Sequence, residues 1–198
     1  KRQAYRQHKK PTFVFPRRKF LSRGLFESLH ADLAEFQQIA VQNSHFHYVL
    51  VIVDVWSKFA WAIPLKNKSG PVVAAAMEKV FQDNPHVRPK NFVTDEGKEF
   101  IGSLFTSVLE KYGVKPFTVF SKNGAAIAER FIRTLKRMIY TYMTDHQTKR
   151  FIDHLQTFVD SYNNRKTRTH GLKPAEVTVH HHKQIQRKLF PEFTEDNI

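Results

Sequence analysis

The sequence contains no cysteine, which excludes a disulfide scaffold, a thiol nucleophile and the usual cysteine-rich zinc site. It also has no apolar run near the ~20 residues that a membrane-spanning helix needs. The longest apolar runs are residues 48–53 and 59–65, and the opening stretch is too polar for a signal peptide. We therefore expect a soluble protein with no membrane association, and the absence of cysteine is compatible with an intracellular setting.

Apolar residues are plentiful enough for one core. The 198 residues are 41% hydrophobic and 13% aromatic, and 18 of them are Phe. This length suits one domain of roughly 150 residues with extensions, and the composition is unlike that of a disordered chain. We expect a basic N-terminal arm over residues 1–22, a folded core over residues 23–178 and a C-terminal tail over residues 179–198.

Acidic residues are scarce relative to basic ones, and the imbalance is local. The 32 Lys and Arg residues outnumber 18 Asp and Glu residues, which gives a formal net charge of +14. Residues 1–26 carry nine basic and no acidic residues, and residues 130–168 carry nine basic and three acidic ones. Two basic patches on a nearly neutral body predict a polyanionic partner, most often nucleic acid. The alternative is a basic linker and a solvated helix face. The basic arm also fits a nuclear targeting signal.

Hydrophobic periodicity predicts an α/β fold in which helices cover a mixed sheet. Three consecutive strands, arranged as a meander, are expected first, followed by a helix, a strand, a helix, a strand and two helices. The expected strands are residues 29–36, 47–55, 59–65, 90–94 and 114–120. The expected helices are residues 69–81, 99–112, 125–143 and 150–163, with a polar turn at residues 121–124.

Three acidic residues occupy positions where the fold could bring them together. Asp32 lies inside the apolar segment HADLAEF, Asp95 ends the strand NFVT, and Glu129 lies one turn into a long helix. Charged residues seldom lie in buried strands unless they are paired, metal-bound or reactive. If the first strand is central, Asp32 lies beside Asp95 at the C-terminal edge of the sheet, and Glu129 can point back toward both. The alternative is that they are ordinary caps and surface acids.

Converging carboxylates repel one another, so a hard divalent cation is their natural partner. Oxygen ligands suit Mg²⁺ or Mn²⁺, and two such ions about 4 Å apart can support an in-line phosphoryl displacement. Arg133, Lys136 and Tyr140 share a helical stripe with Glu129. A row of cations leading away from a metal-binding acid is what a passing phosphate backbone requires. A surface ion pair between Glu129 and Arg133 is the alternative reading.

Several segments resemble the catalytic core of retroviral-type integrases, and most closely the integrases of Maverick (Polinton) DNA transposons. The likeness runs from about residue 25 to residue 177 and keeps the order and rough spacing of the acids. The resemblance implies an RNase H-like fold with a five-stranded mixed sheet flanked by helices. The segments that carry it are ADLAEF, VIVDVWSKFAWAIPLKNKSG, VTDEGKEF, SKNGAAIAERFIRTLKRMIYTYMT and SYNNRKTRTHGLKPAEV.

The same resemblance implies a catalytic D,D,E triad of Asp32, Asp95 and Glu129 that binds two Mg²⁺ or Mn²⁺ ions. The implied activity is that of a polynucleotidyl transferase that processes the 3′ ends of an element's DNA and joins them to target DNA. The implied partners are these element ends and the target duplex, the implied assembly is a homodimer or tetramer, and the implied location is the nucleus. The residues expected to contact DNA are Lys122, Asn123, Arg133, Lys136 and Arg137.

The sequence departs from the family pattern in two respects. Many integrases carry Gln and Gly just before the catalytic Glu, whereas this chain has Ala125 and Ala126, so the loop contacts to DNA are expected to shift to Lys122 and Asn123. The zinc-binding N-terminal domain and the C-terminal DNA-binding module of the family are absent from this sequence. We therefore expect the core of a longer protein.

Several other polar residues are expected to be structural or solvated. Asp54, in the segment VDVWSK, is interpreted as structural, and the tract of residues 180–182 is interpreted as solvated rather than metal-binding. The positions that look like structural signatures of the family are Tyr162, Asn163, His170 and Pro174.

Two alternative functions remain open. A nuclease of RNA/DNA hybrids with the same fold would take an acid from the helix after the meander, where only Glu78 near its end is available. An integrase-derived host protein that binds DNA without catalysis is the other alternative, and the intact triad argues against it.

Overall fold

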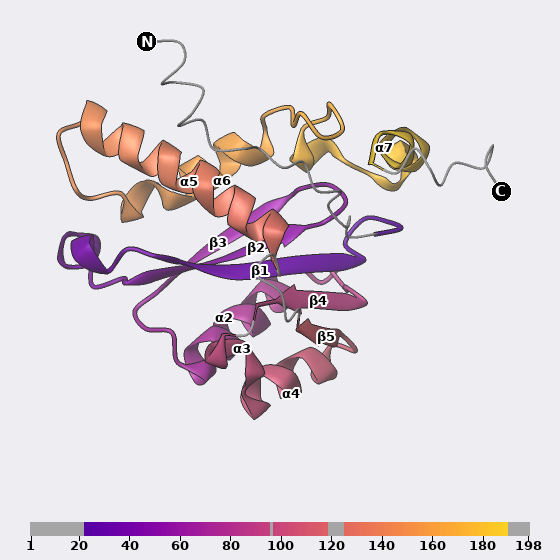
Figure 1. Ribbon diagram of the computed structural model, residues 1–198, viewed down its shortest axis with the longest axis horizontal. Helices are drawn as coiled ribbons and strands as arrows, with labels where there is room; N and C mark the ends of the chain where they lie inside the picture. Colours follow the sequence, from indigo (N-terminus) through magenta and orange to yellow (C-terminus); the bar gives the residue numbers. More distant parts are fainter. Residues whose placement is uncertain (1–21, 96, 119–124, 190–198) are drawn as a thin grey trace, which may run out of the picture.

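The computed structural model describes residues 22–95, 97–118 and 125–189. Residues 1–21 of the expected basic arm, the expected turn at residues 121–124 and the end of the chain from residue 190 lie outside this part. Within it, helices pack against both faces of one mixed β-sheet (Figure 1). This arrangement is the α/β architecture that the sequence predicts.

The sheet has the strand order β3-β2-β1-β4-β5, which places β1 in its centre. The first strand, β1 (Ser28–Glu35), is antiparallel to β2 (Tyr48–Asp54), and β2 is antiparallel to β3 (Ala60–Leu65). On the other side of β1, the strands β4 (Asn91–Thr94) and β5 (Lys115–Thr118) run parallel to it. The predicted meander and the predicted five-stranded mixed sheet are confirmed.

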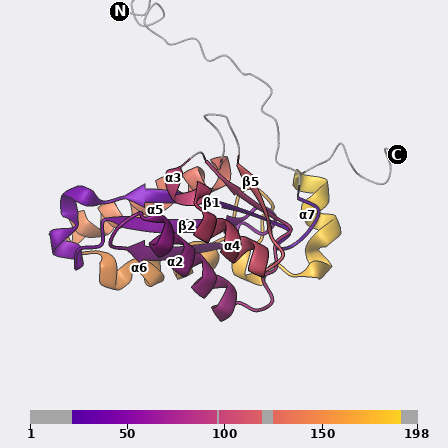
Figure 2. The same cartoon turned by 90° about the horizontal axis from the view of Figure 1, so that it is seen from below.

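The helices form two layers and one flanking element. Helices α2 and α4 pack on one face of the sheet with the short α3 beside them, and α5 and α6 cover the other face (Figures 1 and 2). Their bounds are α2 (Gly70–Asp83), α3 (Lys98–Ile101), α4 (Ser103–Lys111), α5 (Ala126–Asp145), α6 (Leu155–Asn163) and α7 (His182–Leu189). Short 3-10 turns are η1 (Gln37–Ile39), η2 (Val41–Asn43), η3 (Ile152–His154), η4 (Pro174–Glu176) and η5 (Val179–His181).

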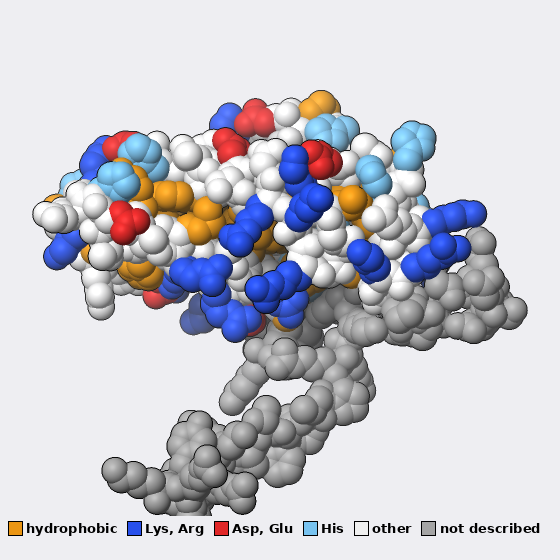
Figure 3. Space-filling view, turned by 90° about the horizontal axis from the view of Figure 1, so that it is seen from above, with side chains coloured by type: hydrophobic (Ala, Val, Ile, Leu, Met, Phe, Trp, Pro, Cys, Tyr) orange, Lys and Arg blue, Asp and Glu red, His pale blue; other side chains and the backbone are white. Residues whose placement is uncertain are grey.

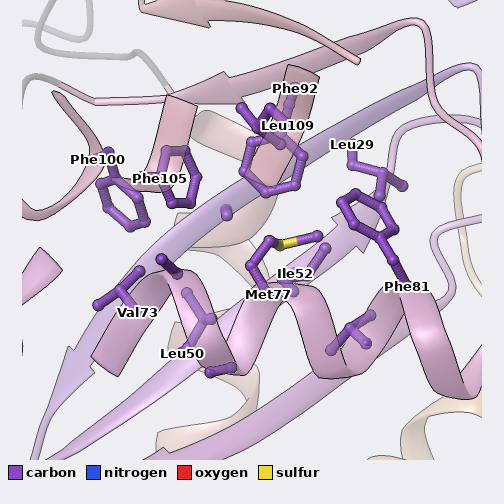
Figure 4. Close-up of a cluster of buried hydrophobic side chains, with 14 of the residues drawn as sticks. Leu29, Leu50, Ile52, Val73, Met77, Phe81, Phe92, Phe100, Phe105 and Leu109 are labelled. Atoms are coloured by element: carbon purple, nitrogen blue, oxygen red, sulfur yellow. The ribbon is translucent and has the colours of Figure 1, made fainter. Parts of the chain in front are cut away.

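Two hydrophobic clusters hold the central strand in place from both sides. Alternation along β1 points Leu29 and Ala31 into the layer of α2 and α4, and Ala34 into the layer of α5 and α6. Figure 4 shows the first cluster, in which Met77 and Phe105 pack close to the sheet. Because each fully buried large apolar side chain contributes about 1.5–3 kcal/mol, β1 and its neighbours form a rigid support.

The structure differs from the expected elements at three places. The helix expected over residues 150–163 begins only at Leu155, because residues 152–154 form the 3-10 turn η3. The helix expected over residues 99–112 is divided, because Gly102 adopts an extended backbone with φ −69° and ψ 149° between α3 and α4. The segment expected to be a C-terminal tail contains α7, whose Ile185 is buried against Trp56 and Val177. The sequence does not reveal this short amphipathic helix, because the segment is strongly basic and Ile185 is the one residue of α7 that is deeply buried.

No helix within the part of the chain that the structure describes has the length and apolar character needed to cross a membrane.

Candidate active site

The register of the sheet brings Asp32 of β1 near Asp95, which comes directly after β4. Strands β1 and β4 pair in parallel, with Ser28 opposite Asn91 and His30 opposite Val93. The same offset continued by two residues places Asp32 opposite Asp95, and side chains two residues apart lie on the same face of a sheet. The condition on which the sequence argument rested, a central first strand, is therefore met.

Helix α5 crosses the face of the sheet on which Asp32 lies. Its buried residues Ala128, Phe131 and Leu135 pack in the same cluster as Ala34 of β1 and residues of β2. Glu129 follows Ala128 in the first turn of α5 and is half-buried. The apolar stripe of α5 thus fixes the start of the helix on the sheet (Figure 1). Glu129 is there close enough for its charge to act on Asp32 of β1.

The charges of the three acids act on one another. Burial, together with the smaller effects of the charges of Asp95, Glu129 and Glu99, raises the pKa of Asp32 from 3.8 to about 6. The opposing influence is the backbone N–H of Leu33, which donates a hydrogen bond of 2.7 Å to Asp32 Oδ1. The arrangement therefore collects negative charge around a carboxylate that is partly removed from water.

In the described residues, these carboxylates do not form a complete metal-binding site. Over residues 22–95, 97–118 and 125–189, no three His, Asp or Glu side chains are arranged so that they could hold a metal as they stand. Without an intervening cation, like charges repel one another and disfavour a closer approach of these carboxylates. Asp95 is exposed and Glu129 is half-buried.

Glu99 is a fourth acid at this site, and the sequence reasoning missed it. The backbone N–H of Gly97 donates a hydrogen bond of 3.1 Å to Asp95 Oδ1. A methyl group built on Gly97 would lie 2.9 Å from Glu99 Cδ and 3.1 Å from Asp95 Oδ1, so both carboxyl groups converge over this glycine. The signal was present in TDEGKEF, where a glycine stands between two acids four residues apart.

Lys68, in the connection between β3 and α2, is a cation at the edge of this acidic group. Its Nζ lies 3.4 Å from Glu35 Oε1 at the end of β1. The hydrogen bond to Glu35 raises the pKa of Lys68, and the charge of Glu99 raises it further. Lys68 was also not identified from the sequence, because nothing in LKNKSG distinguishes it from an ordinary loop lysine.

The outward stripe of α5 carries most of the side chains predicted to contact DNA. Arg133 and Arg137 are exposed, and Tyr140 retains 50% of its accessible surface. Lys136 is half-buried, with Nζ 5.5 Å from the centroid of the Phe36 ring, so it is less available than the stripe predicts. Lys122 and Asn123 lie outside the described residues. An open hollow of about 430 Å³ lies farther along α5 and is lined by Arg137, Tyr140, Thr141, Thr144 and Asp145.

Asp54 serves the backbone of the turn between β2 and β3. Its carboxylate accepts hydrogen bonds from the backbone N–H of Phe26 at 3.1 Å, the backbone N–H of Ser57 at 2.7 Å and the Ser57 hydroxyl at 2.6 Å. Burial raises the pKa of Asp54 to about 6. These contacts match the structural interpretation of this residue.

Asn163 and His170 also have structural partners. The Asn163 side-chain amide donates to the Ala60 carbonyl and accepts from the Ala60 N–H, both at 2.9 Å, which ties α6 to the start of β3. The buried His170 ring has Nε2 2.9 Å from the Ser57 carbonyl oxygen, while its Nδ1 accepts from the N–H of Leu172. The structural roles predicted for these two residues are confirmed.

Comparison with known proteins identifies the family of the chain. The family described as Integrase core domain matches residues 27–125, which is half of the chain. This protein therefore belongs to the integrase core domain family. The matched range contains Asp32 and Asp95 and ends just before α5, so Glu129 lies outside it.

Its relatives come from mobile elements. The chain is 37% identical over 135 residues to a transposon-derived protein of Caenorhabditis elegans, and this match covers 68% of the chain and 47% of the relative. It is 30% identical over 140 residues to the retrovirus-related Pol polyprotein from transposon 412 of Drosophila melanogaster, covering 69% of the chain and 11% of that protein. The chain thus matches less than half the length of these relatives.

A solved structure has the same fold. The cryo-EM structure of the simian T-cell lymphotropic virus intasome in complex with PP2A regulatory subunit B56 gamma contains a chain that matches with a TM-score of 0.69 and 19% sequence identity. The match covers 86% of this chain and 60% of that one. It agrees with the RNase H-like integrase core fold expected from the sequence.

Proposed function

We propose that this chain is the catalytic core of an integrase that processes the 3′ ends of an element's DNA and joins them to target DNA in a metal-dependent reaction. The observation that carries the proposal is the electrostatic coupling of Asp32 to Asp95 and Glu129. These acids come from the centre of the sheet, the end of β4 and the first turn of α5. Membership of the integrase core domain family supports the same reaction class.

The donor set of the triad suits a hard divalent cation, because it consists of carboxylate oxygens only. The raised pKa of Asp32 supports this, since burial first and neighbouring negative charges second make this carboxylate retain its proton, and a bound cation would offset both effects. Asp32 and Asp95 would hold one Mg²⁺ or Mn²⁺ ion, and Asp32 and Glu129 would hold a second. When bound, two such ions activate the attacking oxygen and stabilise the leaving oxygen of an in-line phosphoryl displacement.

The side chains of α5 would orient the DNA relative to the triad. Arg133 lies one helical turn beyond Glu129, and Arg137 lies one turn farther, so their exposed guanidinium groups are available to successive phosphates. Lys136 would contribute from its position over the Phe36 ring. Lys122 and Asn123, just before α5, stay as predicted contacts.

Three further parts of the proposal rest on the sequence. The motifs favour a Maverick (Polinton) type of element as the source. The basic residues of the N-terminal arm favour a nuclear location, where chromosomal DNA is the target. A homodimer or tetramer follows from the need to join two DNA ends, and the solved structure with the matching fold is itself an intasome.

A strand-transfer assay tests the proposal. The protein is incubated with Mg²⁺ or Mn²⁺, a labelled duplex carrying the element's end and a supercoiled plasmid, and joined product is measured. We expect product from the wild type, none from Asp95→Asn, and wild-type levels from Asp83→Asn. The control removes the same charge from an exposed residue of α2 that pairs with Lys79. Product that persists in Asp95→Asn would contradict the proposal.

One observation favours the non-catalytic alternative: among the described residues, the acids do not form a complete metal-binding site. DNA binding without cleavage of any substrate under these conditions would favour an integrase-derived DNA-binding protein. The RNase H-like nuclease alternative is weaker, because Glu78 of α2 pairs with Lys111 of α4 in the layer on the other face of the sheet from α5.

A further inference from the structure

The last part of the described chain carries a strong positive charge that the proposed active site does not use. Residues 165–189 contain seven Lys and Arg residues and one acid, Glu176, which pairs with Lys173. The other six basic residues are all exposed, and in the described ranges none of them pairs with a carboxylate. We call this set the α7 basic surface: Arg165, Lys166, Arg168, Lys183, Arg187 and Lys188.

The α7 basic surface is fixed to the body of the protein. Ile185 is fully buried, and the Trp56 ring stacks on the His182 ring with centroids 4.9 Å apart. Lys188 Nζ donates a hydrogen bond of 3.2 Å to the carbonyl of His170, which joins α7 to the loop that carries Arg165, Lys166 and Arg168. The cations of the helix and of the loop are therefore held near one another without a large entropic cost for a partner that binds them.

The surface lies at the opposite end of the molecule from the C-terminal part of α5 (Figures 1 and 2). Figures 1 and 2 place α7 at one end of the long axis of the molecule, while α5 begins over the middle of the sheet and runs toward the opposite end. Seen from the side of α5 and α7, Lys and Arg side chains follow one long edge and continue to one end of the molecule (Figure 3). The first turn of α5, which carries Glu129, thus lies between the outer part of α5 and α7.

The side chains of the α7 basic surface favour duplex DNA over single-stranded nucleic acid. Residues 165–189 contain no Phe, Tyr or Trp, and three of their four His rings are engaged, since His170 is buried, His181 caps Thr178 and His182 stacks on Trp56. They therefore provide a poor platform for the stacking of unpaired bases. They provide guanidinium and ammonium groups together with Thr and Gln side chains, the groups that contact phosphates of a duplex backbone. Several exposed cations on one supported surface suit the repeated phosphates of duplex DNA.

We propose that the α7 basic surface binds the phosphate backbone of duplex DNA at a place distinct from the α5 stripe. The inference rests on the proposed function, in which an element end and a target duplex meet at one triad. With one duplex along α5, the second has a cationic support at the end of the molecule where α7 lies. The binding is independent of sequence, because phosphate contacts carry no base information.

The test is the affinity for a short random-sequence duplex, measured by fluorescence anisotropy over a series of salt concentrations without divalent metal. Lys183→Gln/Arg187→Gln removes two exposed cations of the surface, and Lys79→Gln/Lys90→Gln removes two from outside it as the matched control. Each lost phosphate contact lowers the log–log salt slope by about 0.9, so we expect a fall of about 1.8 for the first variant. We expect the control and the charge-conserving Lys183→Arg/Arg187→Lys to retain the wild-type slope.

Wild-type duplex affinity and slope in Lys183→Gln/Arg187→Gln, with its thermal midpoint unchanged, would overturn the inference. Polyglutamate is tested as a second ligand. If Lys183→Gln/Arg187→Gln binds polyglutamate more weakly than the wild type but binds the duplex equally well, the inference is overturned and an acidic protein is indicated as the partner. Arg133→Gln/Arg137→Gln, measured in parallel, separates the two proposals. If only this α5 variant binds duplex weakly, the inference fails and the proposed function stands. If the α7 variant loses affinity while the wild type joins no DNA, the inference survives and the proposed function fails.

Discussion

Replacing Asp32 with Asn should stabilise the metal-free protein, although it removes a proposed metal ligand. The pKa of Asp32 is raised from 3.8 to about 6 by burial and by neighbouring negative charge. One pKa unit corresponds to about 1.4 kcal/mol, so keeping this carboxylate ionised costs the fold at most about 3 kcal/mol. Because the group is partly exposed, solvent screening lowers the expected gain for Asp32→Asn to about 1–2 kcal/mol.

The hydrogen bond that Asp32 accepts from Leu33 does not offset this gain, since the amide oxygen of Asn can accept it as well. For a chain of this length, the gain corresponds to a rise of about 3–6 °C in the thermal midpoint. Asp83→Asn is the matched control, because the exposed pair that it breaks contributes less than about 1 kcal/mol.

The pH dependence gives the sign of the effect. A carboxyl group whose pKa is higher in the folded state binds more protons there, so unfolding free energy falls as pH rises between the two pKa values. The difference between Asp32→Asn and wild type should therefore be small below about pH 4, grow as the pH passes toward 6, and stay constant above it. Other buried titratable groups, such as Asp54, are present in both proteins, so their contributions to the pH dependence cancel when the two unfolding free energies are subtracted.

Metal should reverse the order of stability. At a concentration a hundred times its dissociation constant, Mg²⁺ or Mn²⁺ would stabilise the wild type by about 2.7 kcal/mol by mass action, which exceeds the gain from Asp32→Asn. Asp32→Asn should not respond. Thermal unfolding with and without metal checks both effects. A variant that melts below the wild type without metal, or a metal response of equal size in both proteins, would refute the reasoning.

Three further predictions follow from individual contacts. Gly97→Ala should leave the thermal midpoint near that of the wild type, because the added methyl group first meets the carboxyl carbon at the end of the flexible Glu99 side chain. The same substitution should lower strand transfer at least tenfold by displacing the carboxyl groups of Glu99 and Asp95, and equal joining by both proteins would count against this prediction. Asn163→Ala should cost about 2–4 kcal/mol in chemical denaturation, because the backbone N–H and carbonyl of Ala60 lose their partner in a buried site. Asp54→Ala should lower stability by a similar amount through unpaired turn donors, while the shift of the thermal midpoint on adding Mn²⁺ stays as in the wild type.

Elements governed by strict patterns could be predicted from the sequence. The β-branched run of β2 and the apolar alternation of β1 lead to the meander, and the apolar stripe of α5 leads to its packing against the sheet. The proximity of Asp32 and Asp95 also followed from the sequence, because a central β1 has β4 as its parallel neighbour and Asp95 comes directly after β4.

Features that depend on tertiary contacts could not be predicted. α7 is stable because Ile185 meets Trp56, a residue more than a hundred positions earlier, and no local pattern announces that contact. Glu99 and Lys68 reach the acidic group only because the start of α3 and the β3–α2 connection fold over the same edge of the sheet. The helical stripe predicts an exposed Lys136, yet its ammonium group lies over the ring of Phe36, the residue that follows β1.

The most direct test of the central claim is to locate bound Mn²⁺ by its paramagnetic broadening of backbone amide signals in the isotope-labelled protein. If Asp32, Asp95 and Glu129 hold the ion together, amides next to these three residues should broaden first, and Asp95→Asn should abolish the effect. Broadening confined to the histidines at residues 180–182, or spread evenly over exposed carboxylates, would contradict the account.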